Sequence, residues 1–176
     1  SERVLIAELM AVELQPFKHR IRINKGQNQG AYDGQPILDA SGIMGQIVHV
    51  SPFYSDVLLI TDPTHSLPVE INRNGLRAIA VGTGQKDLLL LEHLPTNADI
   101  SVGDLIVSSG LGRRFPAGYP VGTVEKISLD PGEPFAKIIV RPSARLEQSR
   151  EVLLVWPPHE RASEQNLKQS DFAYKL

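Results

Sequence analysis

The sequence predicts an all-β protein made of two six-stranded β-barrel modules that are related by an internal repeat. Runs of four to eleven residues rich in Val, Ile and Leu are separated by Gly, Pro, Asn and Asp, as is typical of short strands joined by turns. Evenly spaced short strands favour barrels or sandwiches, and closure into a barrel removes exposed sheet edges. Twelve strands are expected, at residues 4–14, 19–24, 36–39, 43–50, 56–61, 67–72, 77–82, 87–93, 105–109, 121–128, 136–141 and 152–156.

The internal repeat rests on two glycine-framed segments. Residues 34–51 contain a glycine, a short apolar strand, a glycine turn, an alternating strand and a serine, and this order returns in residues 103–111 and 122–128. A similar short segment follows each copy, at 63–67 and at 142–146. Two copies are too few for a solenoid, which needs at least about three. They predict two similar β-modules whose glycines let the strands bend at barrel corners.

Local patterns support the individual elements. Residues 19–24 alternate between polar and apolar side chains, as a half-buried strand does. Residues 88–91 are all leucine, and their position between turn signals favours a short strand over a helix. The Asn-Gly pair at 74–75 and the Asp-Pro-Gly sequence at 130–132 predict tight turns.

The repeat also suggests how the chain divides into domains. The first barrel module is expected in residues 1–72 together with adjoining strands, and the second in about 73–156. This division leaves open that one module is discontinuous. Residues 157–176 are mostly polar and are expected to form a disordered tail.

Composition excludes several classes of function. The 176 residues carry a net charge of -2, so no charge excess steers the chain toward nucleic acid. Cysteine is absent, which excludes disulfides and thiolate metal sites. No two of the five histidines are spaced as metal ligands, and no cofactor is expected. The apolar runs are too short to cross a bilayer, and because the chain starts at Ser1 we expect a fragment that lacks its targeting segment.

A nucleophilic triad is the first candidate chemistry, because a pair of six-stranded barrels is also the architecture of chymotrypsin-like proteases. Asp62, His65 and Ser109 would supply the acid, the imidazole and the hydroxyl. Their order along the chain is not the chymotrypsin-like one, and Ser109 lacks the glycines that surround a protease nucleophile. We therefore expect no catalytic site, and a degenerate chymotrypsin-like serine hydrolase is kept as an alternative.

The second copy of the repeat carries an insertion within residues 112–121. It contains Arg113, Arg114, Phe115 and Tyr119, and a loop of arginine and aromatic residues has the composition of a protein-binding hot spot. The alternative is that Phe115 and Tyr119 plug the open end of a barrel. The sequence leaves both alternatives open.

Two further features pose similar choices. Phe53 and Tyr54 lie between two strands of the first module and are weaker candidates for a protein contact. Residues 110–114 contain glycines and an arginine pair, as an anion-binding loop does, but no helix follows them. They therefore predict a turn that carries a solvated basic pair.

Several spaced segments together resemble the family of the rod-shape-determining protein MreC. The most specific are residues 102–112 and 115–122, which are similar to the signature segment of that family. One departure is Ser108, where the family usually has threonine. The resemblance extends over roughly 3–156, and it is supported in the first module by residues 23–26, 34–36, 42–48 and 55–62 together with Gly30.

The resemblance implies a non-enzymatic scaffold of the bacterial cell-elongation machinery with two six-stranded barrels. In this family the barrels lie on the extracytoplasmic (periplasmic) side of the inner membrane, after one membrane helix and a coiled coil. Such a domain is expected to self-associate into dimers or filaments and to bind an elongation-specific penicillin-binding transpeptidase. The complete protein is expected to engage MreB, MreD and RodA. A cell-wall carbohydrate-binding module is a further alternative, although the chain has only one Trp to stack on sugars.

Overall fold

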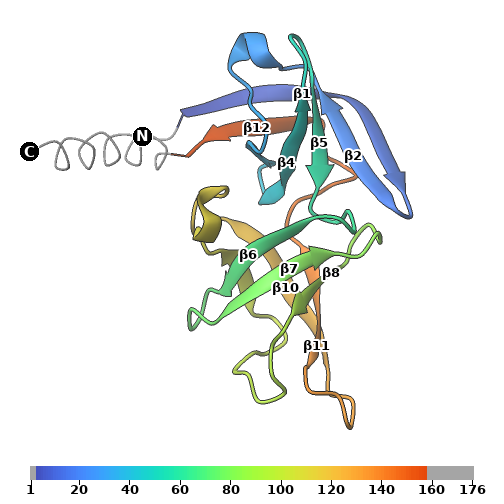
Figure 1. Ribbon diagram of the computed structural model, residues 1–176, viewed down its shortest axis with the longest axis vertical. Coiled ribbons are helices and arrows are strands. Elements are labelled where there is room, and N and C mark those ends of the chain that lie inside the picture. The colour runs from blue at the N-terminus through green and yellow to red at the C-terminus, as the bar shows by residue number, and fades with distance from the viewer. Residues whose placement is uncertain (1–2, 158–176) are drawn as a thin grey trace, which may run out of the picture.

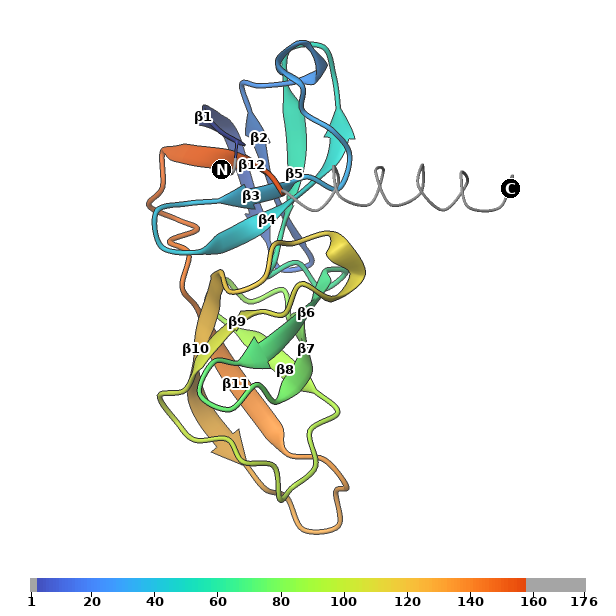
Figure 2. The same cartoon turned by 90° about the vertical axis from the view of Figure 1, so that its left-hand side faces the viewer.

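The structure, a computed structural model that describes residues 3–157, consists of two closed antiparallel β-barrels stacked end to end (Figure 1). The same stacking is visible after a quarter turn in Figure 2. Each barrel has six strands, so the predicted all-β fold is confirmed. The expectation of a disordered tail at 157–176 concerns residues that, apart from Pro157, lie outside the described part of the chain.

All twelve predicted strands are present in the described residues. The first barrel contains β1 (Arg3–Gln15), β2 (Lys18–Ile23), β3 (Pro36–Leu38), β4 (Ile43–Val50), β5 (Ser55–Leu59) and β12 (Glu151–Trp156). The second contains β6 (Ser66–Ile71), β7 (Arg77–Gly82), β8 (Leu89–Glu92), β9 (Leu105–Ser108), β10 (Pro120–Ser128) and β11 (Lys137–Pro142). Two short 3-10 helices are η1 (Gln27–Gln29) and η2 (Leu111–Arg113).

The two barrels have the same pairing scheme. In the first, β12 pairs with β1 and β3, and β4 lies between β3 and β5. In the second, β6 pairs with β7 and β9, and β10 lies between β9 and β11. Along the chain, the six strands β1–β6 therefore match the six strands β7–β12. The last strand of each set is inserted into the other barrel, so the repeats exchange a strand.

The strand exchange corrects the predicted division at residue 72. That boundary follows the last strand of the first strand repeat, β1–β6, but β6 belongs to the second barrel and β12 completes the first. The first barrel is thus the discontinuous one. The chain crosses between barrels twice, through residues 60–65 and 143–150, and these crossings overlap the two similar short segments noted in the sequence, 63–67 and 142–146.

The interior of each barrel is filled by side chains from alternate positions of its strands. Along β2, for example, His19, Ile21 and Ile23 are buried while the residues between them are exposed. The core of the second barrel is continuous with apolar side chains from the first, among them Leu38, Ile43 and Val155. The two barrels therefore share a buried apolar interface in addition to the two crossings.

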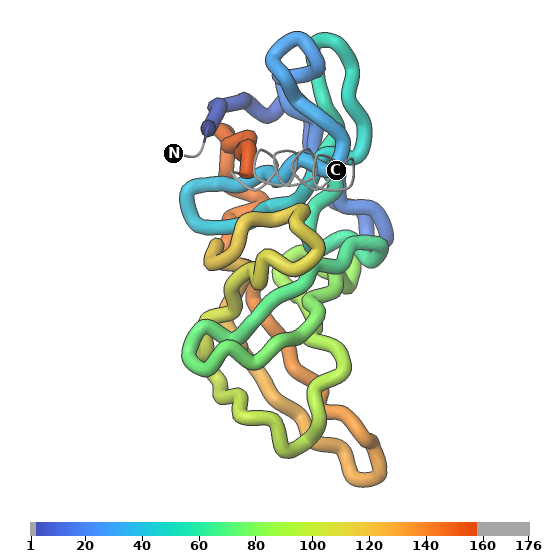
Figure 3. The backbone as a smooth tube through the Cα atoms, turned by 60° about the vertical axis from the view of Figure 1, so that its left-hand side comes forward, coloured from blue at the N-terminus to red at the C-terminus, as the bar shows by residue number. Residues whose placement is uncertain are grey.

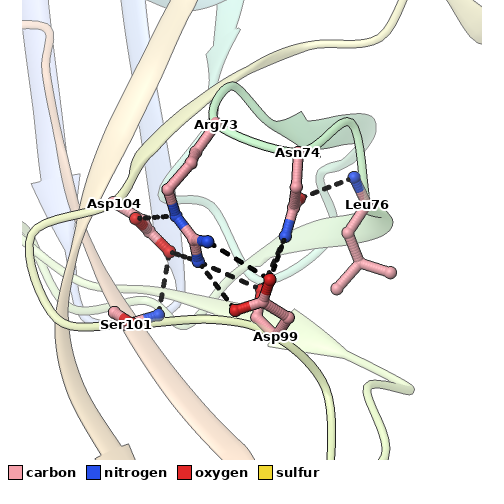
Figure 4. A network of polar contacts seen from close by, with 6 residues as sticks. All are labelled: Arg73, Asn74, Leu76, Asp99, Ser101 and Asp104. Atoms are coloured by element: carbon pink, nitrogen blue, oxygen red, sulfur yellow. Dashed lines mark hydrogen bonds and ion pairs between the residues drawn. The ribbon is translucent and has the colours of Figure 1, made fainter.

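A surface network of charges links two loops of the second barrel (Figure 4). Arg73, in the turn between β6 and β7, donates hydrogen bonds to Asp99 and Asp104 in the loop before β9. The Arg73 guanidinium lowers the pKa of both carboxyl groups, chiefly through these hydrogen bonds. Asn74 Nδ2 adds a hydrogen bond to the Asp99 carbonyl oxygen at 2.8 Å. The network fixes the long loop to the predicted Asn-Gly turn.

Candidate interaction site at the joint between the barrels

The first crossing is held by a buried carboxylate. Asp62 is 2% exposed and accepts hydrogen bonds from the backbone N–H groups of His19 and Thr64, each at 2.8 Å. Burial acts to raise the pKa of Asp62, but the hydrogen bonds from Thr64 and His19 outweigh it, and the pKa is lowered overall. Because His19 belongs to β2, Asp62 attaches the crossing to the first barrel.

The second crossing is held by another buried carboxylate, Asp39, in the turn between β3 and β4. One oxygen accepts hydrogen bonds from the N–H groups of Ser41 and Gly42, at 2.8 and 3.0 Å. The other accepts from the Arg145 N–H at 2.6 Å and from the Ser149 hydroxyl at 2.9 Å. Asp39 thus attaches the returning chain to the first barrel, as Asp62 attaches the outgoing chain.

Asp62, His65 and Ser109 do not form a triad in this arrangement. His65 is 3% exposed, and its Nε2 lies 2.8 Å from Gln46 Oε1 rather than near a serine. Burial lowers the pKa of His65 to about 4, which makes it a poor general base at neutral pH. The Ser109 hydroxyl oxygen accepts the N–H of Leu111 at 3.2 Å. These side chains stabilise the joint and its loops.

The insertion between β9 and β10 folds back onto the joint, beside the turn between β3 and β4 (Figure 3). Phe115 is 5% exposed, belongs to the core of the second barrel and meets the His65 ring edge to face at 6.1 Å. Ser108 fixes the loop from inside, because its hydroxyl accepts the Tyr119 N–H at 3.0 Å and donates to the Pro116 carbonyl. Tyr119 is half-buried against the same core. Of the two alternatives, the geometry favours Phe115 as a plug.

Arg113 and Arg114, by contrast, are exposed on this loop. They line a hollow of about 250 Å³ between the barrels, whose opposite wall is formed by Tyr32, Asp33 and Gly34 of the first barrel. Within residues 3–157, neither arginine forms an ion pair with an acidic side chain. Arg113 has a left-handed backbone, with φ of 58°, which is uncommon for a residue with a side chain.

Gln46 forms the floor of this hollow. It is 8% exposed, and its Oε1 is occupied by His65, while its Nε2 donates to no acceptor among the described residues. The hollow therefore presents two guanidinium groups and one amide donor opposite a single carboxylate, that of Asp33. We call this hollow the arginine groove; it is lined by Tyr32, Asp33, Gly34, Gln46, Arg113 and Arg114.

The weaker aromatic candidates lie on the first barrel, between β4 and β5. Phe53 is 71% exposed, and Tyr54 is half-buried with the Arg22 guanidinium 4.2 Å from its ring centroid. The single Trp, Trp156, is covered in the same way by Arg3, also at 4.2 Å. Phe53 is therefore the more accessible of these rings.

Other kinds of site find no support in the described residues. From Arg3 to Pro157, no three His, Asp or Glu side chains are grouped so that they could hold a metal ion. No helix in that part of the chain is long and apolar enough to span a membrane.

Two closed barrels with a shared apolar interface and two hydrogen-bonded crossings define a class of all-β double-barrel proteins. Comparison with known families shows which family of this class is present: residues 9–156 match the model described as rod shape-determining protein MreC, barrel core. The chain belongs to this family, whose members are cell shape-determining proteins and not enzymes.

Individual relatives agree with this assignment. The chain is 49% identical to the cell shape-determining protein MreC of Haemophilus influenzae over 152 residues, which is 86% of this chain and 43% of the relative. It is 44% identical to MreC of Escherichia coli over 156 residues, or 89% of this chain and 42% of the relative. The chain thus spans less than half the length of these curated relatives.

Solved structures show the same fold. A crystal structure of MreC from Pseudomonas aeruginosa is 57% identical, with a TM-score of 0.85, and the match covers 88% of this chain and 99% of that one. More distant structures share the fold alone. One is the major periplasmic domain of the cell shape-determining filament MreC, at 23% identity and a TM-score of 0.73. Another is MreC in a complex with the penicillin-binding protein PBP2 from Helicobacter pylori, at 16% identity and 0.66.

Proposed function

We propose that this chain is the extracytoplasmic part of an MreC scaffold, which maintains rod shape by self-associating and by binding a penicillin-binding transpeptidase. The observation that carries the proposal is the rigid double barrel, in which two exchanged strands and two buried carboxylates fix the barrels to each other. A body of this kind holds its surface loops in constant relative positions. That property suits a protein whose output is the placement of its partners.

The related structures support both parts of the proposal. One relative is described as a filament and another occurs in a complex with PBP2. In the complete protein, a membrane helix would confine the domain to the periplasmic face of the inner membrane, and confinement raises the effective concentration of neighbours. MreB, MreD and RodA are proposed as further partners of the complete protein.

Sedimentation velocity of the purified chain over a concentration series, with and without the transpeptidase, tests the proposal. The expected result is a sedimentation coefficient that rises with concentration and a separate species when the transpeptidase is added. A chain that stays monomeric throughout and forms no complex would contradict it. Comparing transpeptidase binding at low and high chain concentration then decides whether self-association competes with the partner.

A further inference from the structure

We propose that two copies of this chain associate head to tail, with the acidic hairpin tip of one copy in the arginine groove of the next. The acidic tip is the turn between β10 and β11, residues 129–134. This inference rests on the self-association proposed above and names the surfaces that produce it. Its ligand chemistry is a pair of carboxylates on a tight turn.

The backbone of the acidic tip has a defined turn geometry. Residues 130–133 form a β-turn in which the Glu133 N–H donates to the Asp130 carbonyl at 3.1 Å, and Gly132 has a φ of 85°. Proline at the second position and a left-handed glycine at the third are typical of a type II turn. Asp130 and Glu133 occupy the two ends of the turn, which bring their Cα atoms within about 7 Å of each other. The turn thus presents two neighbouring carboxylates.

Among residues 3–157, the charged side chains of both surfaces have no ion-pair partner. Some basic side chains of the second barrel are paired, as Arg73 is with Asp104 and Arg141 with Glu125, whereas Arg77, Lys126 and Lys137 form no ion pair among the described residues. Among the described residues, Asp130 and Glu133 form no ion pair with a basic side chain. Arg113 and Arg114 of the groove form none with an acidic side chain. All four side chains are exposed. A contact between the two surfaces would pair them without breaking an existing interaction.

The groove favours a protein turn over a polyanion. Its own Asp33 would repel a run of negative charges, and the net charge of the chain, -2, gives no long-range attraction for one. A turn with two carboxylates matches two guanidinium groups and leaves Asp33 to face backbone N–H groups. Leu129 and Phe135, which flank the tip and are 58% and 49% exposed, supply apolar area around the charged contact.

The positions of the two surfaces determine the kind of assembly. The tip, between β10 and β11, is at the far end of the second barrel from the first (Figures 1 and 2). The groove borders the first barrel, because Tyr32, Asp33 and Gly34 form one of its walls. One copy therefore cannot fill its own groove. A contact between two different surfaces leaves one of each free at the ends, so it extends into an open chain of copies unless it closes as a ring.

Charge reversal tests this contact by sedimentation velocity of the whole chain. The groove variant is Arg113→Glu with Arg114→Glu, and the tip variant is Asp130→Lys with Glu133→Lys. Each variant alone should associate about tenfold more weakly than the unaltered chain, because two attractions become two repulsions. An equimolar mixture should recover association, since every groove then meets a tip of opposite charge. The matched control for the groove variant, Arg77→Glu with Arg150→Glu, has the same change in net charge as that variant, also at exposed sites, and should associate normally.

The outcomes separate this inference from the function on which it rests. Association of the unaltered chain that both variants retain would overturn the head-to-tail contact and leave the proposed scaffold intact. A groove variant that loses only transpeptidase binding would assign the groove to that partner and overturn the contact as well. Failure of the mixture to recover, with both variants folded by circular dichroism, would also contradict it. If the unaltered chain does not associate at any concentration, the self-association proposed as part of its function is contradicted.

Discussion

The two strand repeats have the same pairing scheme and differ most in the connection between their third and fourth strands. In the first repeat this connection is the short turn at 39–42, and in the second it is the long loop at 109–119. Both lie at the joint between the barrels. The short turn uses a polar group, Asp39, to hold the crossing chain, whereas the long loop uses an apolar one, Phe115, and exposes two arginines. An insertion can therefore add an exposed site without altering the strand pairing of the barrel that carries it.

The largest effect is expected from removing the apolar anchor of the long loop. Phe115→Ala should lower the free energy of unfolding by about 3–5 kcal/mol, because a buried aromatic ring leaves a cavity. Chemical denaturation measures this loss. Phe53→Ala is the matched control, since the same truncation at a 71% exposed ring should cost little. Equal losses of unfolding free energy in the two variants would contradict the role of Phe115 as a buried anchor.

The next effect concerns His65, on which Phe115 packs. Its pKa is about 4 in the folded chain and about 6.5 in the unfolded chain, so the unfolded state binds more protons between these values. The contribution of His65 to the free energy of unfolding is therefore fully present above pH 6.5. It is lost as the pH drops toward 4, by about 3 kcal/mol in total. Unfolding free energies across this range should show the slope. His65→Gln should remove it, and a variant with an unchanged slope would assign the dependence to another group.

A smaller effect is expected at the short turn. Asp39→Ala leaves the N–H groups of Ser41, Gly42 and Arg145 without their acceptor, which should cost about 1–3 kcal/mol. Thermal unfolding of this variant, compared with the exposed control Asp33→Ala, measures the cost. If both variants unfold at the same temperature as the unaltered chain, the hydrogen bonds of Asp39 contribute nothing to stability, and the short turn has no polar anchor.

The smallest effect is expected away from the joint. Arg73→Ala removes an exposed network that fixes one loop of the second barrel, and exposed ion pairs contribute little to stability and are screened by salt. Thermal unfolding at low and high salt should show a slight loss that diminishes as salt is added. A loss as large as that of Phe115→Ala would indicate that this loop supports the whole barrel.

Much of the fold could be predicted from the sequence, because strands and turns depend on local patterns. Alternation in 19–24 and the leucine run at 88–91 both correspond to strands, β2 and β8. The exchange of β6 and β12 could not be predicted in this way. Alternation shows which side chains of a strand face a core, but it does not show which of two similar barrels provides that core.

The candidate site was predictable in part. The insertion marked Arg113 and Arg114, and the structure places both on the surface. The burial of Phe115 was undecided, because an aromatic residue in a loop suits a core and a contact equally well. Asp39 and Gln46 were missed, since their roles depend on distant partners; Asp39 bonds a residue 106 positions away. The similar segments at 63–67 and 142–146 were the available signal, because both mark a crossing.

The exchanged strands have a mechanical consequence. If the barrels were joined by one tether, a pulling force between them would extend that tether first and leave both sheets intact. Here β6 and β12 are each hydrogen-bonded on both edges inside the opposite barrel, so tension loads two ladders at once. Stretching of single molecules held at opposite ends should therefore show one high-force rupture without an early slack extension. The exchanged strands therefore allow the domain to transmit a pulling force along its long axis.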